Sequence, residues 1–169
     1  MPASKESKLV LHSTWGPIVV LARSGRVVSC DLPRRDRAPS EDPKILREEV
    51  QLSDRGDAAV LKQAARFVRA AIAGRAASAP PVLEEGAPFF LACRRAMQRI
   101  PLGESVTYRE LAANAGSPAA VRAAGQACAR NPLCLFVPCH RVLAVNGNLG
   151  GFSSGLAWKE YLLRVEARR

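Results

Sequence analysis

The chain has 169 residues, and its 25 Lys and Arg outnumber its 15 Asp and Glu to give a formal net charge of +10. Hydrophobic residues make up 48% of the sequence, a balance that indicates one or two globular domains and excludes collagen-like, coiled-coil and mucin-like chains. No apolar run approaches the roughly 18 residues of a membrane span, and residues 1–14 lack the apolar stretch of a secretory signal. We therefore expect a cytoplasmic protein with no membrane partner.

The positive charge favours a polyanionic partner, because each Lys or Arg placed near a phosphate releases a condensed counterion. Solubility is the alternative explanation of the charge. No Asp or Glu occurs between Leu111 and Lys159, so a surface formed by this stretch would not repel a nucleic acid backbone. The five cysteines lack framework spacing, and we expect all of them to be reduced thiols.

The N-terminal elements predict a small α/β domain over residues 1–82. Runs rich in Val, Leu and Ile at 8–14 and 17–30, broken by turn-forming residues, predict a β-hairpin or meander. Charged and proline-bearing residues at 33–55 predict a loop with a short helix at 45–50.

A helix is predicted at 57–73, because apolar residues recur there at helical spacing and Gly74 follows as a stop. Its apolar face would pack on the sheet. The sequence AASAPP at 76–81 cannot continue this helix and predicts the linker.

The C-terminal residues 83–169 predict a mainly helical domain. A helix is expected at 89–100, and Thr107 and Glu110 have the capping-box spacing at the start of a second helix. Ser117 and Pro118 have the residue types of an N-cap and a first helical position.

The helix predicted at 119–129 would be the second of a helix-turn-helix pair, which is typical of DNA-binding domains. It consists mostly of small residues, which favour close packing against another helix or, on DNA, close approach to a minor groove. Arg122 is the single long side chain on the surface that this helix would present to DNA.

A cysteine next to a histidine, Cys139-His140, follows an apolar run at 133–137 that predicts a buried strand. A thiol becomes a nucleophile when a base or a positive field favours its thiolate. Adjacency alone is weak support, because neighbouring side chains on a strand point to opposite faces. His12 is the only other histidine and no Cys-x-x-Cys pair occurs, so we predict no metal and no cofactor.

The segment 138–142, Pro-Cys-His-Arg-Val, resembles the active-site signature of the O6-alkylguanine-DNA alkyltransferases, also called methylated-DNA–protein-cysteine methyltransferases. The similarity covers roughly residues 86–166 in the family's order and spacing. It includes Ile100-Pro101-x-Gly103-Glu104, Thr107-Tyr108, Arg122, Asn131-Pro132, Gly150-Gly151-Phe152-Ser153 and Lys159-Glu160. The resemblance implies a ribonuclease-H-like sheet-plus-helix domain, followed by a mainly α domain with the helix-turn-helix and the active-site cysteine.

The implied reaction is repair of O6-alkylguanine in double-stranded DNA, with methyl preferred and O4-alkylthymine as a further substrate, by one irreversible transfer per molecule. The alkylated base must first leave the stack, and Arg122 would fill its place. Cys139 would attack the alkyl carbon, His140 would take the thiol proton through a water, and Glu166 would orient the imidazole. Tyr108 would sterically crowd the 3′ phosphate, and its hydroxyl would donate a hydrogen bond to the ring nitrogen of the flipped base.

The resemblance also assigns residues to the DNA-binding surface and to the base pocket. The small residues of the recognition helix would lie against DNA together with Arg122 and Tyr108: Ala123, Ala124 and Gly125. The pocket would be formed by the Phe152 ring, the Ser153 backbone N–H and the Val142 carbonyl. Asn131 would tie the recognition helix to the active-site segment.

Two positions depart from the family pattern: Arg94 stands where tryptophan is common, and Ser154 stands where glycine is usual. We expect the first to alter packing and the second to reshape the loop over the pocket. Zinc ligands found in some members are unmatched, since only His12 and Cys30 could contribute.

Three other functions compete with repair. A non-catalytic protein that binds alkylated DNA would lack Cys139, and a helix-turn-helix regulator would need more base-reading side chains than Arg122 and Gln126. A thiol hydrolase would need an oxyanion hole that the sequence does not show. We expect a monomer that works on nucleoid DNA.

Overall fold

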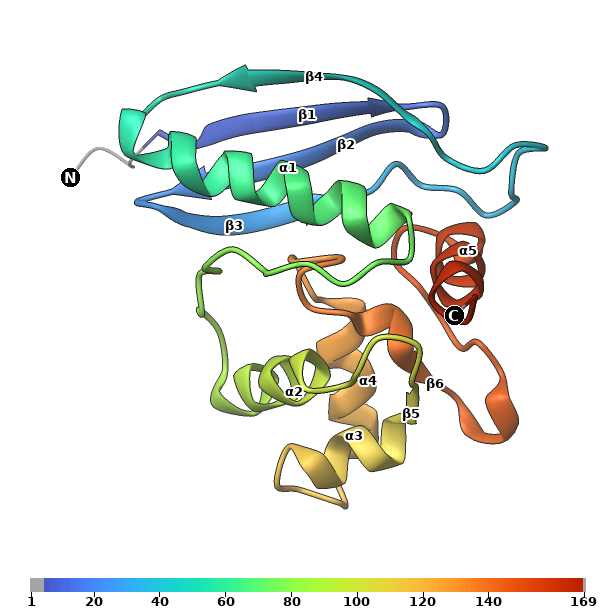
Figure 1. Cartoon of the computed structure of the whole chain (residues 1–169). Coiled ribbons are helices and arrows are strands. Elements are labelled where there is room, and N and C mark those ends of the chain that lie inside the picture. Colours follow the sequence, from blue (N-terminus) through green and yellow to red (C-terminus); the bar gives the residue numbers. More distant parts are fainter. Residues whose placement is uncertain (1–4, 169) are drawn as a thin grey trace. The chain divides into compact units, whose positions relative to one another are not determined.

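A computed structural model describes residues 5–168, which divide into two compact units (Figure 1). The first unit contains residues up to Pro33, then Ala38–Leu83 and Pro132–Phe136. The second contains Arg34–Arg37, Glu84–Asn131 and the chain from Val137 onward. Relative to the expected boundary between residues 82 and 83, Leu83 and Pro132–Phe136 belong to the first unit, and Arg34–Arg37 belong to the second.

The first unit is built on a four-stranded antiparallel sheet. Its strands are β1 (Ser7–Ser13), β2 (Gly16–Arg23), β3 (Arg26–Asp31) and β4 (Ile45–Gln51), in the spatial order β3-β2-β1-β4. Ser24 and Gly25 connect β2 to β3 with φ of 53° and 71°, the left-handed pair that a two-residue hairpin turn requires. The predicted meander over residues 8–30 is confirmed.

Strand β4 replaces the short helix that we expected at 45–50, so that prediction is wrong. Its residues pair with β1 in antiparallel register, with Val50 opposite Leu9 and Glu48 opposite Leu11. Leu46 and Val50 alternate with Arg47 and Glu49, which is a strand pattern. Pairing with β1 outweighs the helix propensity of the charged residues.

Helix α1 (Ala58–Ile72) packs on β1, β2 and β3 through its apolar face, as the helical spacing predicts. Val60, Leu61 and Val68 are buried on this face. Asp57, directly before the helix, is fully buried, and its Oδ1 accepts a hydrogen bond of 2.8 Å from the Gly25 backbone N–H. The carboxylate thus links the start of α1 to the β2–β3 turn.

The apolar run at 133–137 is buried as predicted, but it does not form the predicted strand. Only Leu133 makes a ladder contact, an isolated bridge to Cys30 of β3. Leu135 has a φ of 72°, which interrupts an extended backbone. Phe136 instead stacks on Phe67 of α1, with 5.0 Å between ring centroids.

The second unit is mainly helical. Its elements are α2 (Pro88–Gln98), β5 (Val106–Thr107), α3 (Tyr108–Asn114), α4 (Val121–Ala129), β6 (Val142–Leu143) and α5 (Leu156–Glu166). The short strands β5 and β6 pair in parallel. Over residues 5–168, no helix has the length and apolar character needed to cross a bilayer. The fold class agrees with the expected sheet-plus-helix domain followed by a helical domain.

The helix-turn-helix consists of α3 and α4. The capping box at the start of α3 is confirmed: the Glu110 N–H donates to the Thr107 hydroxyl at 3.2 Å, and the Thr107 N–H donates to the Glu110 carboxylate at 2.6 Å. The predicted cap of α4 is wrong, because this helix begins at Val121 with Ala120 before it. Ser117 instead closes a turn in which its carbonyl accepts from the Ala120 N–H at 2.9 Å.

Candidate active site

Cys139 begins a single 3-10 turn, Cys139–Arg141, that leads into β6. The Val137 carbonyl before it accepts two hydrogen bonds, from the Cys139 N–H at 2.8 Å and from the Asn131 side-chain amide at 2.9 Å. Asn131 therefore anchors the turn to the end of α4. Successive residues of a 3-10 turn point about 120° apart, so the objection that strand neighbours point to opposite faces does not apply to Cys139 and His140.

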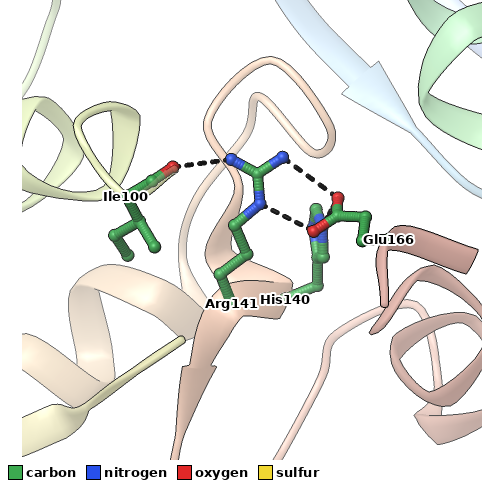
Figure 2. Close-up of polar contacts among 4 residues, drawn as sticks. All are labelled: Ile100, His140, Arg141 and Glu166. Atoms are coloured by element: carbon green, nitrogen blue, oxygen red, sulfur yellow. Dashed lines mark hydrogen bonds and ion pairs between the residues drawn. The ribbon is translucent and has the colours of Figure 1, made fainter. Parts of the chain in front are cut away.

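Behind the turn, His140 and Arg141 share one carboxylate, that of Glu166 in α5 (Figure 2). His140 Nε2 lies 2.7 Å from Glu166 Oε1. Arg141 donates from Nε to Glu166 Oε2 at 2.9 Å and from Nη2 to Oε1 at 3.0 Å, while its Nη1 donates to the Ile100 carbonyl at 2.8 Å. His140 and Glu166 are each 2% exposed, so bulk water does not compete for these contacts.

The charges of this cluster follow from its contacts. Burial raises the pKa of Glu166, but hydrogen bonds and charges from His140 and Arg141 outweigh burial and lower it to about 2. Burial lowers the pKa of His140 below its usual range, although Glu166 opposes this shift. At neutral pH the cluster is therefore a neutral imidazole beside an ionised carboxylate and a guanidinium.

The imidazole tautomer follows from the same contacts. An ionised carboxylate only accepts hydrogen bonds, so His140 must carry its proton on Nε2 and donate it to Glu166. Nδ1 is then left with a lone pair. This atom is buried and has no hydrogen-bond partner within residues 5–168. It lies on the residue next to Cys139 and is the one basic atom of the cluster that remains able to accept a proton.

Lys159 of α5 is a second buried cation at the site, with 1% of its surface exposed. Its Nζ donates to the Val142 carbonyl at 2.7 Å and to the Gly151 carbonyl at 3.3 Å, and lies 6.0 Å from the centre of the Tyr108 ring. Burial lowers the pKa of Lys159, while Cys139 and Cys128 oppose the shift. An ammonium that interacts electrostatically with Cys139 favours the thiolate form of that cysteine.

A pocket of about 330 Å³ opens beside Cys139. Residues of α3, α4, the cysteine turn and the following loop line it: Tyr108, Gly125, Cys128, Ala129, Cys139, Gly151, Phe152 and Ser153. Burial, together with the nearby Cys128 and Cys139, raises the pKa of Tyr108. Its phenol therefore stays protonated at neutral pH and can donate a hydrogen bond into the pocket.

The loop over the pocket, residues 150–155, is shaped by two glycines. Gly150 has a φ of +68°, and a Cβ there would lie 2.8 Å from the Tyr108 hydroxyl. Gly155 has a φ of +94°, and a Cβ there would clash with the Arg35 carbonyl oxygen. Arg35 holds the same loop by donating its N–H to the Ser154 carbonyl at 2.8 Å and accepting from the Ala157 N–H at 3.1 Å.

The residues expected to contact DNA lie mainly on α4. Arg122 is exposed, and Ala123 and Gly125 are half-buried. Ala124 is fully buried, because it faces the interior side of the helix, so it cannot contact DNA as we expected. Tyr108 begins α3 and faces the pocket from the other helix of the pair.

The residues expected around the base divide into two groups. Phe152 and Ser153 line the pocket. Asn131 and Val142 are buried and do not line it. Asn131 instead fixes the cysteine turn, and the Val142 carbonyl already accepts one hydrogen bond from Lys159.

The two departures from the family pattern have distinct surroundings. Arg94 in α2 donates from Nη1 to the Glu85 carbonyl at 2.7 Å, and its Nε is buried without a hydrogen-bond partner in the described chain. Ser154 is buried, and its backbone carbonyl is the atom that Arg35 holds. The second departure therefore lies at the anchored end of the loop over the pocket.

Sequence reasoning missed the roles of Lys159 and Arg141. Lys159 was noted only as part of a motif, yet it stands among apolar residues of α5 that are all buried: Ala157, Trp158, Tyr161 and Leu162. A lysine in such a setting is a signal of a paired or functional ammonium. Cys128 is the small apolar packing residue that a thiol in a helix of alanines indicates, and it also lines the pocket.

Among residues 5–168, no group of three or more His, Cys, Asp or Glu side chains is placed to hold a metal ion. The nucleophile, base, carboxylate and buried cation are all supplied by side chains of the second unit. This arrangement suits transfer of an alkyl group to sulfur, because the residue next to the thiol has an unpartnered basic nitrogen and the Lys159 ammonium interacts electrostatically with Cys139.

Comparisons with known proteins agree with this geometry. Residues 88–168 match the family model described as 6-O-methylguanine DNA methyltransferase, DNA binding domain. The methylated-DNA–protein-cysteine methyltransferase of Methanosarcina acetivorans is 45% identical over 106 residues, which cover 62% of this chain and 68% of that protein. The constitutive enzyme of that name from Bacillus subtilis is 41% identical over 128 residues, 75% of this chain and 78% of that protein.

The fold has close counterparts among solved structures. The crystal structure of Mycobacterium tuberculosis OGT in complex with DNA superposes with a TM-score of 0.74 at 26% identity. The superposition covers 94% of this chain and 91% of that one. The similarity therefore extends over both units, beyond the residues that match the family model.

Proposed function

Since this chain belongs to the methylated-DNA–protein-cysteine methyltransferase family, the O6-alkylguanine-DNA alkyltransferases, we propose that Cys139 is the methyl acceptor of its repair reaction. The protein is an O6-methylguanine DNA methyltransferase, a DNA repair enzyme. One observation carries the assignment of the acceptor. Cys139 lines the pocket, and the adjacent imidazole is held by Glu166 with its other nitrogen unpartnered.

The substrate has to leave the DNA stack before Cys139 can reach it. Guanine O6 lies inside the duplex, whereas Cys139 is 4% exposed at the base of a pocket. The nucleotide is therefore flipped out of the helix into this pocket. Arg122, exposed on α4 beside small residues, enters the space that the base leaves.

The transfer itself is an in-line displacement at the methyl carbon. The bond between Cys139 Sγ and the carbon forms as the bond between the carbon and guanine O6 breaks. The thiol proton passes to His140 Nδ1, through a water as the family resemblance implies, and the resulting imidazolium is stabilised by the ionised Glu166. Lys159 supports the thiolate and holds the Val142 and Gly151 carbonyls in place.

Negative charge builds on guanine as it becomes the leaving group. The protonated phenol of Tyr108 donates to a ring nitrogen, and the Ser153 backbone N–H faces the oxygen. Phe152 gives the base an apolar wall. The Cys139 carbonyl receives the exocyclic amine. The Val142 carbonyl, which the resemblance also implies, is disfavoured, because Val142 is fully buried, does not line the pocket and already accepts a hydrogen bond from Lys159 Nζ.

The product is a thioether, which is a very poor leaving group, so each molecule acts once. Methyl is the preferred adduct, and O4-alkylthymine is a second substrate. One chain supplies the nucleophile, the imidazole, the carboxylate and the buried ammonium, so we propose that the acting unit is a monomer on double-stranded DNA, in the cytoplasm where the nucleoid lies. A damage-binding protein without chemistry and a helix-turn-helix regulator are both disfavoured, the first by Cys139 and the second by how few long side chains α4 exposes.

Mass spectrometry after incubation with an O6-methylguanine oligonucleotide tests the proposal. We expect the intact protein to gain one methyl group per molecule and the peptide containing Cys139 to carry it. An unmodified duplex of the same sequence is the control and should leave the mass unchanged. An intact mass that never shifts with the methylated duplex would end the repair assignment for this chain.

Arg122→Ala is expected to slow transfer from a methylated duplex by about tenfold to a hundredfold, because flipping loses the side chain that occupies the vacated stack. Transfer from free O6-methylguanine base should change less than twofold or so, since no stack has to be opened. Arg130→Ala removes the same charge at the other end of α4 and serves as the control. Equal losses on duplex and free base would contradict the role of Arg122.

A further inference from the structure

Helix α1 and the segment that follows it carry charge of one sign. No Asp or Glu occurs in residues 58–83. The same stretch contains four cations, Lys62, Arg66, Arg69 and Arg75. The repair reaction does not account for this charge, because the cysteine turn and all the residues that line its pocket belong to the second unit.

A groove of about 500 Å³ lies between α1 and this following segment. After α1 the chain runs back beside the helix (Figure 1), and Gln63 Nε2 donates to the Ala79 carbonyl at 3.1 Å. The lining residues are Ala59, Lys62, Gln63 and Arg66 on one face of the helix, and Ala77 and Ser78 on the returning chain. No carboxylate is among the described residues that line the groove, so nothing there neutralises its cations.

Two of the four cations are available to a ligand in this groove. Lys62 and Arg66 are exposed, and neither side chain forms an ion pair or a hydrogen bond within residues 5–168. Arg69 differs from them, because it donates to Glu48 Oε2 at 2.9 Å. Positions 62 and 66 are four residues apart, about 6 Å along the helix axis, and therefore point to the same side of α1. The groove thus presents a pair of unneutralised charges, together with the Ser78 hydroxyl.

The composition of the groove favours a polyanion over a folded protein as its ligand. Protein interfaces depend on large apolar or aromatic anchors, and none of the large exposed apolar residues of the described chain lines the groove. The polyanion that the repair reaction brings to this chain is duplex DNA. We propose that the groove is a second DNA-binding surface, at which Lys62 and Arg66 contact neighbouring phosphates of a duplex.

The second surface has a different task from that of α4. Contacts to phosphates carry no sequence information, so this surface binds damaged and undamaged duplexes equally and keeps the chain on DNA between lesions. Each phosphate contact releases a counterion, which makes the affinity dependent on salt. The proposal rests on duplex DNA being the substrate and goes beyond the transfer reaction, because neither Lys62 nor Arg66 belongs to the site of chemistry.

Binding of an undamaged duplex at several salt concentrations tests the proposal on the full chain. At about 50 mM salt, Lys62→Gln/Arg66→Gln should bind on the order of tenfold more weakly than the parent, and its plot of log affinity against log salt should be shallower by about two. Lys8→Gln/Arg26→Gln removes the same charge from two exposed strand residues outside the groove and should keep the parent slope. No methyl group is transferred in this titration, so its outcome is independent of the assignment of Cys139.

Acetylation of lysines, read by mass spectrometry, locates the bound DNA directly. Saturating undamaged duplex should slow modification of Lys62 severalfold and leave Lys8 as reactive as in the free protein. A polyglutamate peptide of equal charge, which stands for an acidic protein partner, should protect Lys62 far less. Circular dichroism and transfer from free O6-methylguanine base should match the parent in both double variants, which excludes misfolding. Equal changes of slope in the two double variants, a Lys62 that stays fully reactive on DNA, or equal protection by polyglutamate would each overturn the proposal.

Discussion

A Cys139→Ala protein is expected to bind a duplex containing O6-methylguanine and to transfer no methyl group to itself. Cys139 is the thiol that both lines the pocket and follows the anchored Val137 carbonyl, next to the imidazole that can accept its proton. Alanine removes the nucleophile and little else, since the side chain shrinks by one atom. Intact mass measures the transfer, and a gel-shift titration measures the binding.

Cys128→Ala is the matched control, because Cys128 lines the same pocket. Burial raises the pKa of Cys128 to about 12, so its thiol is protonated at neutral pH. Its sulfur lies 3.7 Å from the Met97 sulfur, which is the contact of a packing residue. This variant should keep methyl transfer within a fewfold of the parent. Residual transfer by Cys139→Ala would mean that the wrong thiol has been assigned.

Glu166→Gln is expected to lower the transfer rate by up to about ten-thousandfold, the loss seen when the orienting carboxylate of a catalytic triad is replaced by an amide. An amide can present its NH₂ to His140 Nε2, which favours the tautomer with the proton on Nδ1 and blocks acceptance from Cys139. Arg141 loses its anionic partner at the same time. Single-turnover transfer kinetics measure the loss, and Glu160→Gln, exposed on the same helix, is the control.

The same variant is also expected to change how the free energy of unfolding depends on pH. The pKa of Glu166 is lowered to about 2 in the folded chain, below the ordinary value of about 4.3. Its ionised form therefore stabilises the fold above about pH 4.3, and this contribution, about 3 kcal/mol, is lost as the pH falls toward 2. Urea unfolding should show the deficit of Glu166→Gln largest at pH 5–7 and smaller near pH 2–3. An equal deficit at all pH values would contradict the shift.

His140 adds acid sensitivity of the same sign. Its pKa is lowered by burial, so its neutral form stabilises the fold above the ordinary value of about 6.5, and this contribution decreases as the pH falls. Unfolding of the parent protein should thus become easier in two stages on acidification. Glu166→Gln removes the stage that belongs to the carboxylate.

Local patterns in the sequence predicted most of the elements. Helix α1, the meander of β1–β3 and the capping box of α3 are all determined by residues close in sequence, namely apolar spacing, turn residues and the Thr107–Glu110 pair. Strand β4 and the irregular 133–137 segment are determined by distant partners, β1 in the first case and Cys30 and Phe67 in the second. Propensity within a short window contains no information on those partners.

The candidate site shows the same division. The motif around Cys139 and the resemblance that it carries pointed to His140, Glu166 and Tyr108, and the structure brings all of them into the second unit around the cysteine turn. Arg141 and Lys159 depend on three-dimensional proximity, because their acceptors are the Ile100, Val142 and Gly151 carbonyls and the Glu166 carboxylate. Every residue has a backbone carbonyl, so the residue types in the sequence do not indicate which carbonyls accept these hydrogen bonds.

The exchange of short segments between the two units limits how the gene can be divided. A fragment that starts at Glu84 would omit Arg35, whose backbone holds the Ser154 carbonyl and the Ala157 N–H. It would also carry residues 132–136 without the β3 strand and the Phe67 ring that shield them. Recombination or shuffling at the apparent boundary would therefore separate the loop over the pocket, residues 150–155, from the Arg35 backbone that supports it, so the two halves are expected to be inherited together.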